Sequence, residues 1–109
     1  MKNLTIHDFD GNSYRGAEKT VVLFHARWCP YCRKFVSSYE KLVRNLPIDA
    51  ALADISDTES ELWNNFLIEV IPTAIMFENG KIVSRLDGIP GIGLRDADFK
   101  VFVGDASHG

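Results

Sequence analysis

Two cysteines separated by two residues are the most reactive groups in this chain. Cys29 and Cys32 are its only cysteines, and a Cys-x-x-Cys spacing suits either a reversible disulfide or part of a metal site. A closed zinc site needs four ligands, but there is no second Cys-x-x-Cys, and the histidines are scattered at His7, His25 and His108. An iron–sulfur cluster shared between two chains is the other metal alternative. We interpret the pair as redox-active, without a metal.

The cysteine pair lies between a predicted strand and a predicted helix. The apolar, β-forming run 21–26 is typical of a strand buried on both faces. From residue 30 to about 45, apolar side chains recur every three or four positions, as on an amphipathic helix. Cys29 would open that helix, where unpaired N–H groups and the helix dipole favour thiolate over thiol. We predict that Cys29 is the exposed nucleophile and that Cys32 is the more buried, resolving thiol.

The remaining pattern predicts an α/β domain. Strands are expected at 3–6, 50–55, 73–77 and 82–86, and helices from about 62 and from 94 to about 103. A capping box at Thr58–Glu61 precedes the helix from about 62. Asn79-Gly80 predicts a hairpin turn. Strands separated by helices pair in parallel, so residues 1–109 should form one domain with a central mixed sheet of four or five strands, flanked by helices on both faces. Residues 1–19 are the hardest to interpret, and 104–109 should form a frayed tail.

Composition and charge exclude several classes of protein. The chain has 15 acidic and 12 basic residues, for a formal charge of -3, so it lacks the basic excess that nucleic-acid binding needs. No apolar run approaches the roughly 18 residues that span a bilayer, and no long apolar stretch near the start suggests a secretory signal. We therefore expect a cytoplasmic monomer with no nucleic-acid or membrane partner, in which a purely structural disulfide is disfavoured.

Three segments together resemble the thioredoxin family. The run 28–32, Trp-Cys-Pro-Tyr-Cys, is similar to its active-site motif. The run 70–73, Val-Ile-Pro-Thr, followed by an apolar strand and the Asn79-Gly80 turn, resembles the family's cis-proline segment and hairpin. Gly88 matches a third family position, and the similarity covers roughly residues 21–103. The dipeptide Pro30-Tyr31 is that of glutaredoxins, so the motif is a hybrid.

The resemblance implies a thioredoxin-like fold and a thiol–disulfide oxidoreductase that acts on protein substrates without a bound cofactor. A reductase or glutathione would supply the electrons. Pro72 should be cis and face the cysteines, and the backbone of Ile71 should hydrogen-bond an extended substrate segment, a form of strand addition. The implied substrate-contact surface consists of Trp28, Pro30, Tyr31, Ile71, Pro72 and Gly88.

Two departures from the family concern the proton of the second cysteine. Leu23 stands where family members usually have a buried aspartate, and residues 51–53 lack the usual lysine. Strand alternation places His25 on the same face as Leu23. Proton transfer between His25 and Cys32 is therefore a hypothesis, and a packed histidine with no proton role is its alternative.

Two other functions stay open. A glutaredoxin-like enzyme that uses glutathione is favoured by Pro30-Tyr31 and by Gly91-Ile92-Gly93 as an anion-contacting loop, whereas Trp28 disfavours it. A binding module without redox chemistry would hold partners around Pro72, although the intact cysteines argue against it. A basic cluster beside the motif is either simply solvated or favours the thiolate and attracts an acidic partner or glutathione: Arg27, Arg33 and Lys34.

Overall fold

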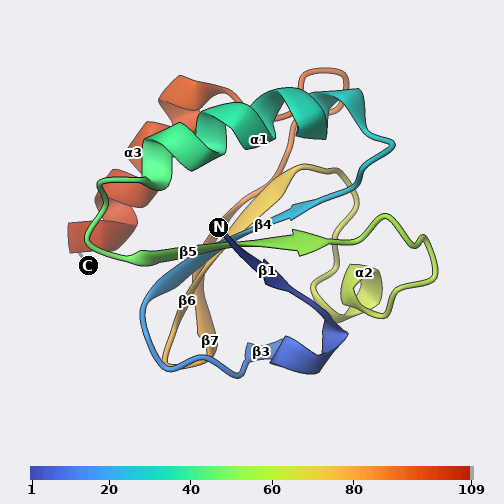
Figure 1. The fold of residues 1–109 in the computed structure, drawn as a ribbon, viewed down its shortest axis with the longest axis horizontal. Coiled ribbons are helices and arrows are strands. Elements are labelled where there is room, and N and C mark those ends of the chain that lie inside the picture. The colour runs from blue at the N-terminus through green and yellow to red at the C-terminus, as the bar shows by residue number, and fades with distance from the viewer. Residues whose placement is uncertain (109) are drawn as a thin grey trace.

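A five-stranded mixed sheet forms the centre of the computed structural model, which describes residues 1–108, with side chains to residue 105 (Figure 1). The strand order is β1-β5-β4-β6-β7. The first three of these strands run parallel and the last two antiparallel to their neighbours. The predicted mixed sheet is therefore confirmed, with these bounds: β1 (Lys2–Leu4), β4 (Thr20–His25), β5 (Asp49–Asp54), β6 (Thr73–Glu78) and β7 (Lys81–Leu86).

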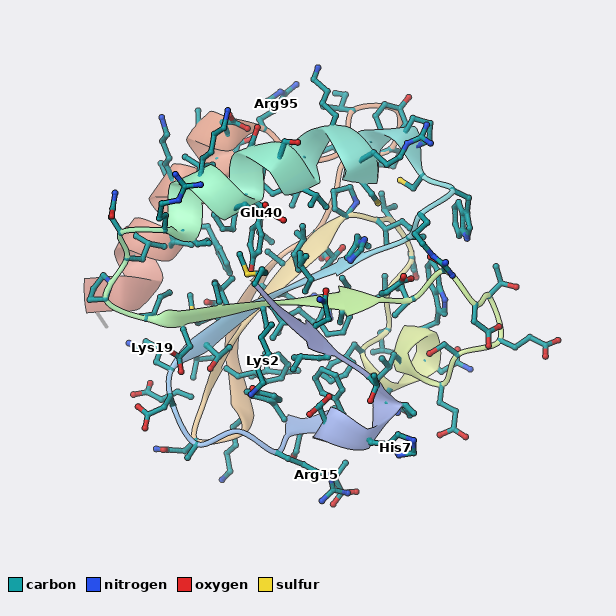
Figure 2. All side chains as sticks on the ribbon, viewed as in Figure 1. Lys2, His7, Arg15, Lys19, Glu40 and Arg95 are labelled. Carbon is teal, nitrogen blue, oxygen red and sulfur yellow. The ribbon has the colours of Figure 1, made fainter. Side chains whose placement is uncertain are left out.

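Helices cover both faces of the sheet, as predicted. The long helices α1 (Pro30–Val43) and α3 (Asp96–His108) lie together on one face, and the short α2 (Leu62–Asn65) lies on the other (Figure 1). Side chains fill both layers between sheet and helices (Figure 2). Central strand β4 is sandwiched, so residues 21–24 are fully buried, which explains why this run is apolar at every position. None of the helices in the described part of the chain could cross a membrane.

The N-terminal segment contains a hairpin that the sequence did not reveal. After the 3-10 turn η1 (Ile6–Asp8), the two-residue strands β2 (Phe9–Asp10) and β3 (Ser13–Tyr14) pair antiparallel. Strands this short carry no readable alternation. The Phe9 and Tyr14 rings pack in an aromatic cluster with Phe77, at centroid distances of 6.2 and 5.6 Å. Tyr14 N–H also donates to Gly80 O (2.8 Å), which ties the hairpin to the turn between β6 and β7.

Helix α2 (Leu62–Asn65) is a single turn and is not preceded by the predicted capping box. The prediction for Thr58–Glu61 is wrong, because the residue before the helix makes no side-chain capping hydrogen bond. Asp57 organises this segment instead. Its side chain accepts from the N–H of Glu59 (2.9 Å), and its carbonyl accepts from the N–H of Ser60 (3.0 Å). Such a local turn competes with the helix for the same backbone donors.

Helix α3 is longer than predicted. It runs to His108, so the predicted end at about Val103 is wrong. The fraying of residues 104–109 stays a prediction, and residue 109 lies outside the described residues. Gly104 suggested an end to the helix, but one glycine costs a helix only about 1 kcal/mol. The helix is held by packing, since the Phe99 ring lies 5.4 Å from each of the rings of Phe35 and Tyr39 on α1.

Candidate active site

Cys29 lies between the end of β4 and the start of α1, as the sequence predicted. It is the N-cap residue of α1, with an extended backbone (φ -98°, ψ 111°), and Pro30 follows at the first helical position. Its sulfur accepts a hydrogen bond from the backbone N–H of Cys32 at 3.2 Å. The sulfur therefore occupies the place of a capping oxygen, facing the positive end of the helix dipole.

Both sulfurs are less accessible than the sequence suggested. Cys29 is only 5 % exposed and Cys32 is fully buried, so their predicted order holds, but the prediction of an exposed Cys29 is wrong. Both cysteines belong to a packed cluster that includes Ala26 and Ile71, and the Cys29 thiol donates toward the carbonyl oxygen of Ile71 at 3.8 Å. The nucleophile is reached over a narrow area, so a substrate must bring its disulfide close to this point.

Cys32 is held in its protonated form. Burial raises its pKa to about 12, and the hydrogen bond with Cys29 and the charge of Cys29 act in the same direction. A hydrogen bond with the backbone of Ala26 opposes them. At neutral pH the second thiol must therefore lose its proton before its sulfur can attack.

The segment opposite the cysteines contains the predicted cis-proline. The Ile71–Pro72 peptide bond is cis, and the contact between Cys29 and Ile71 shows that this segment faces the nucleophile. Gly88 lies against it: a Cβ at this position would come within 2.6 Å of Pro72 O. Thr73 joins the two, because its hydroxyl donates to Val70 O (2.6 Å) and accepts from Gly88 N–H (3.4 Å). Ile71, Pro72 and Gly88 of the predicted contact surface are therefore buried.

The other predicted contact residues lie at the surface beside Cys29. Trp28 is 53 % exposed and Tyr31 is 45 % exposed, and Pro30 between them is also exposed. Ile89 and Ile92 extend this apolar surface from the loop before α3. The structure therefore brings the predicted residues together around Cys29, and an exposed aromatic and aliphatic rim is suited to holding a partner protein.

A polar network that the sequence did not reveal holds the segment before Cys29. Ser56 Oγ accepts from Arg27 N–H (2.7 Å) and from Arg27 Nε (3.3 Å), and its carbonyl accepts from Trp28 Nε1 (2.8 Å). Asp54 accepts from both the backbone N–H and the hydroxyl of Ser56 and lies 3.2 Å from Arg27 Nε. One signal was available: β4 and β5 are parallel neighbours, so the residues that follow them meet at one edge of the sheet.

Trp63 of α2 packs against Trp28. The two indole rings are stacked, with centroids 6.4 Å apart and planes inclined by 6°. Trp63 Nε1 donates to the carbonyls of Ile55 (3.1 Å) and Asp57 (3.2 Å). The sequence placed Trp63 only within the helix predicted from about residue 62, because nothing in its spacing pointed toward Trp28.

His25 ends β4 opposite Asp54 of β5. Its Nε2 is buried and has no hydrogen-bond partner within the described part of the chain. Burial lowers the pKa of His25, the carboxylate of Asp54 raises it, and Arg27 lowers it further, with a net lowering. His25 is therefore neutral at pH 7 and can accept a proton. It lines a cavity of about 240 Å³ together with Ala26, Arg27, Arg33 and Val36.

Asp54 and the predicted basic cluster complete the charges near the site. Although burial raises the pKa of Asp54, hydrogen bonds from Ser56 lower it below its usual value, as do the charge of Arg27 and, in acid where it is protonated, the charge of His25. Arg33 borders the His25 cavity, whereas Lys34 borders a different one. The basic residues are thus divided between two cavities.

No group of three or more potential ligands in the described residues could hold a metal ion.

Comparisons with known proteins place this site in a family. The model of the thioredoxin family matches residues 1–96. Thioredoxin Y2, chloroplastic, of Arabidopsis thaliana is 33% identical over 89 residues, which are 80% of this chain and 53% of that protein. Thioredoxin of Mycobacterium bovis is 33% identical over 72 residues, 65% of this chain and 62% of that protein. The chain thus spans about half the length of the first curated relatives it matches.

Solved structures agree on the fold. Thioredoxin f2 of Chlamydomonas reinhardtii has a TM-score of 0.80 at 18% identity, covering 97% of this chain and 95% of that one. Fasciola hepatica thioredoxin has a TM-score of 0.75 at 24% identity, covering 96% and 98%. Since the family model covers all the segments that surround Cys29, the chain belongs to the thioredoxin family.

Proposed function

We propose that this protein is a thiol–disulfide oxidoreductase that reduces or exchanges disulfides of protein substrates through Cys29 and Cys32. The observation that carries the proposal is the sulfur of Cys29 at the N-cap of α1, 3.2 Å from the backbone nitrogen of Cys32, with the second thiol buried behind it. Members of the thioredoxin family catalyse this chemistry and generally need no bound cofactor.

The reaction has two displacement steps. The Cys29 thiolate attacks one sulfur of the substrate disulfide, the substrate S–S bond breaks, and the released substrate thiolate takes up a proton. Cys32 then loses its proton and attacks the Cys29 sulfur, which releases the second substrate thiol. Two electrons have moved to the substrate, and the protein is left with a Cys29–Cys32 disulfide. A reductase or glutathione would return it to the dithiol.

The test is turnover of a protein disulfide, such as insulin with dithiothreitol as donor. Cys29→Ser should lose catalysis, whereas Cys32→Ser mixed with insulin in the absence of dithiothreitol should accumulate a mixed disulfide at Cys29, one substrate per chain by intact mass. Equal rates for Cys29→Ser and the wild type would instead support the alternative of a binding module without redox chemistry.

We assign His25 as the group that accepts the proton of Cys32. Leu23 leaves the usual carboxylate position apolar, and His25 is neutral with an unpartnered Nε2. Ala26, whose backbone hydrogen-bonds Cys32, lines the same cavity as His25. A water molecule in that cavity would connect the two groups.

Glutathione is the second candidate electron donor, and Pro30-Tyr31 between the cysteines is the observation in its favour. Oxidised protein mixed with either glutathione or thioredoxin reductase plus NADPH discriminates between the two, because recovery of free thiols with glutathione alone would define a glutaredoxin-like enzyme.

The cytoplasm is our proposed location, since a pair that must return to the dithiol needs a reducing compartment. Relatives named by compartment are chloroplastic or mitochondrial and do not favour it. Fractionation of the producing cells tests the location, and size-exclusion chromatography tests the expected monomer.

A further inference from the structure

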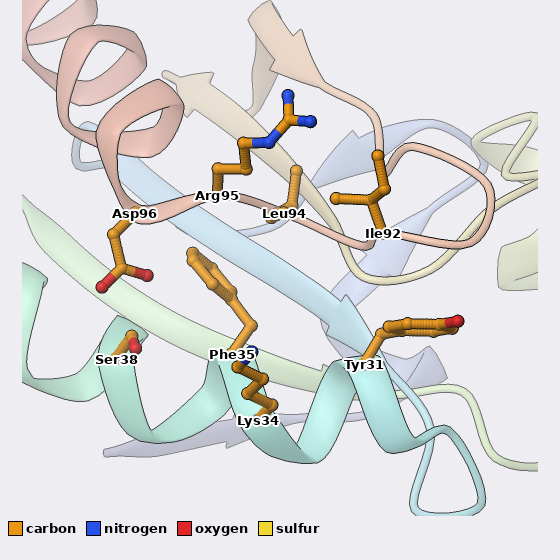
Figure 3. A pocket seen from close by; sticks show the side chains of 8 residues that line it. All are labelled: Tyr31, Lys34, Phe35, Ser38, Ile92, Leu94, Arg95 and Asp96. Atoms are coloured by element: carbon orange, nitrogen blue, oxygen red, sulfur yellow. The ribbon is translucent and has the colours of Figure 1, made fainter.

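A cavity of about 340 Å³ opens beside the active-site motif, between α1 and the loop that leads into α3 (Figure 3). Tyr31 and Ile92 lie at one end of it and Asp96 faces Ser38 at the other, with Phe35 between them. Because Tyr31 stands between the two cysteines, the cavity begins at the edge of the proposed active site.

The loop wall of this cavity is preformed. Ile89 and Gly93 exchange two backbone hydrogen bonds of 2.8 Å, and Ile92 N–H donates to Ile89 O at 2.9 Å. Gly93 is packed so closely that an added Cβ would lie 2.9 Å from Tyr31 Cβ and 3.6 Å from Pro72 Cδ. The loop is therefore attached to residues that surround Cys29, so the opening lies beside the sulfur that a substrate disulfide must reach.

The charges around the cavity are mainly positive. Lys34 lines it and takes part in none of the ion pairs found among residues 1–105. Arg95 reaches only Asp98, at 3.9 Å, and both side chains are half exposed, so this pair is weak. The one carboxylate of the lining, Asp96, lies at the end away from Tyr31. Lys34 and Arg95 thus flank the opening of the cavity, although the whole chain has a formal charge of -3.

We propose that this cavity binds an acidic side chain of the substrate protein, in the segment next to the cysteine that Cys29 attacks; this inference rests on the proposed function. The stem of the side chain contacts Tyr31 and Ile92, and its carboxylate reaches Lys34 and Arg95. Charge complementarity of this kind sets partner choice and speeds encounter. The cavity therefore selects among disulfide proteins by the charge that flanks their cysteine.

Two disulfide peptides that differ only by Glu or Gln next to the cysteine test the inference. The wild type should reduce the Glu peptide with a kcat/KM about fivefold higher, the size expected for partly exposed ion pairs. The double variant Lys34→Gln/Arg95→Gln should reduce both peptides equally. Lys41→Gln is the matched control, because this exposed lysine of α1 does not line the cavity, and it should keep the preference. A wild type without preference, or a double variant that retains it, would overturn the inference.

Binding to Cys29→Ser separates this inference from the proposed function, because no redox step is involved. The Glu peptide should bind about fivefold more tightly than the Gln peptide and shift the amide resonances of Tyr31 and Ile92, and about 0.5 M NaCl should remove the difference. Equal binding of the two peptides would refute the cavity's role whether or not the cysteines are active. S-methylglutathione that displaces the Glu peptide and shifts the same resonances would assign the cavity to a tripeptide carboxylate and also contradict the inference.

Discussion

Cys29 and Cys32 face opposite chemical requirements within one helical turn. The first sulfur accepts a backbone N–H and must ionise, whereas burial and its partner keep the second thiol protonated, with a pKa of about 12. The first step needs the sulfur of Cys29 as the attacking group, and the second step also needs a base for the proton of Cys32. Residues near Cys32 that can take a proton should control the release of substrate more than its capture.

Replacement of His25 by Gln tests that idea. The mixed disulfide of the variant should resolve about tenfold more slowly at pH 7, because general-base assistance is lost, and the difference should shrink as hydroxide takes over toward pH 9. The wild-type rate should fall in acid as the imidazole becomes protonated, below its usual pKa because burial lowers it. Single-turnover kinetics across pH measure both effects. Arg33→Gln, which alters the same cavity without removing the imidazole, is the control, and an unchanged pH profile for His25→Gln would leave His25 as a packed residue.

Ser56→Ala tests whether the hydrogen bonds of Ser56 position the segment that contains Trp28. The change removes the hydroxyl that accepts from Arg27 N–H and donates to Asp54, so we expect a loss of about 1 kcal/mol of stability. Substrate KM should rise more than kcat falls, since the reacting sulfurs are untouched. Urea unfolding and steady-state kinetics measure the two quantities. Ser37→Ala on the exposed face of α1 serves as the control, and a loss confined to kcat would count against a positioning role.

Glycines in two elements should respond in opposite ways to alanine. Gly93, in the loop before α3, has φ +84° and would place a Cβ 2.9 Å from Tyr31 Cβ, so Gly93→Ala should cost about 1–3 kcal/mol. Gly104, inside α3, has nothing within 4 Å of its would-be Cβ, and Gly104→Ala should add about 0.5–1 kcal/mol. Thermal and urea unfolding of both variants provide the comparison. A neutral Gly93→Ala would mean that the loop moves away from Tyr31 at little cost.

The elements that the sequence predicted best are those with a long, regular pattern. The apolar run before Cys29 and the apolar stripe after it are each set by burial on a sheet, so β4 and α1 were found within a few residues. The β2–β3 hairpin was missed because two-residue strands have no period, and α2 was overestimated because the turn around Asp57 displaced its predicted cap. Helix α3 was underestimated because packing of Phe99 outweighs the weak helix propensity of Gly104.

For the site, local motifs were readable and contacts across the chain were not. The roles of the cysteine pair and the cis-proline segment follow from short runs of residues. By contrast, Ser56 and Trp63 act through hydrogen bonds and ring stacking with residues 29 and 35 positions away, which no local pattern encodes. The burial of Cys29 was also missed, because it depends on contact with Ile71, which is distant in the sequence.

The whole molecule should lose stability in alkaline solution, more so when reduced. The folded protein keeps the Cys32 proton to a pKa of about 12, against 9.0 for an ordinary thiol, so the stabilisation is present below pH 9 and is lost between about 9 and 12. Burial also raises the pKa of Tyr39, whose hydroxyl donates to Val21 O (3.0 Å) and Ala51 O (2.9 Å). The oxidised protein has no Cys32 thiol, and its unfolding free energy should therefore fall less steeply over this range. Identical slopes for the two redox states, by urea unfolding at several pH values, would show that Cys32 does not contribute.

The close approach of Gly88 to the proline segment affects how the activity of related proteins is predicted from their sequences. A gene copy that gained any side chain at position 88 would place its Cβ 2.6 Å from the Pro72 carbonyl oxygen and disturb the main chain opposite the reactive sulfur. We expect such a copy to lose activity although it keeps both cysteines. A comparison of relatives that checks only for the two cysteines would therefore overlook this requirement, so we expect glycine at this position to be a second criterion for activity.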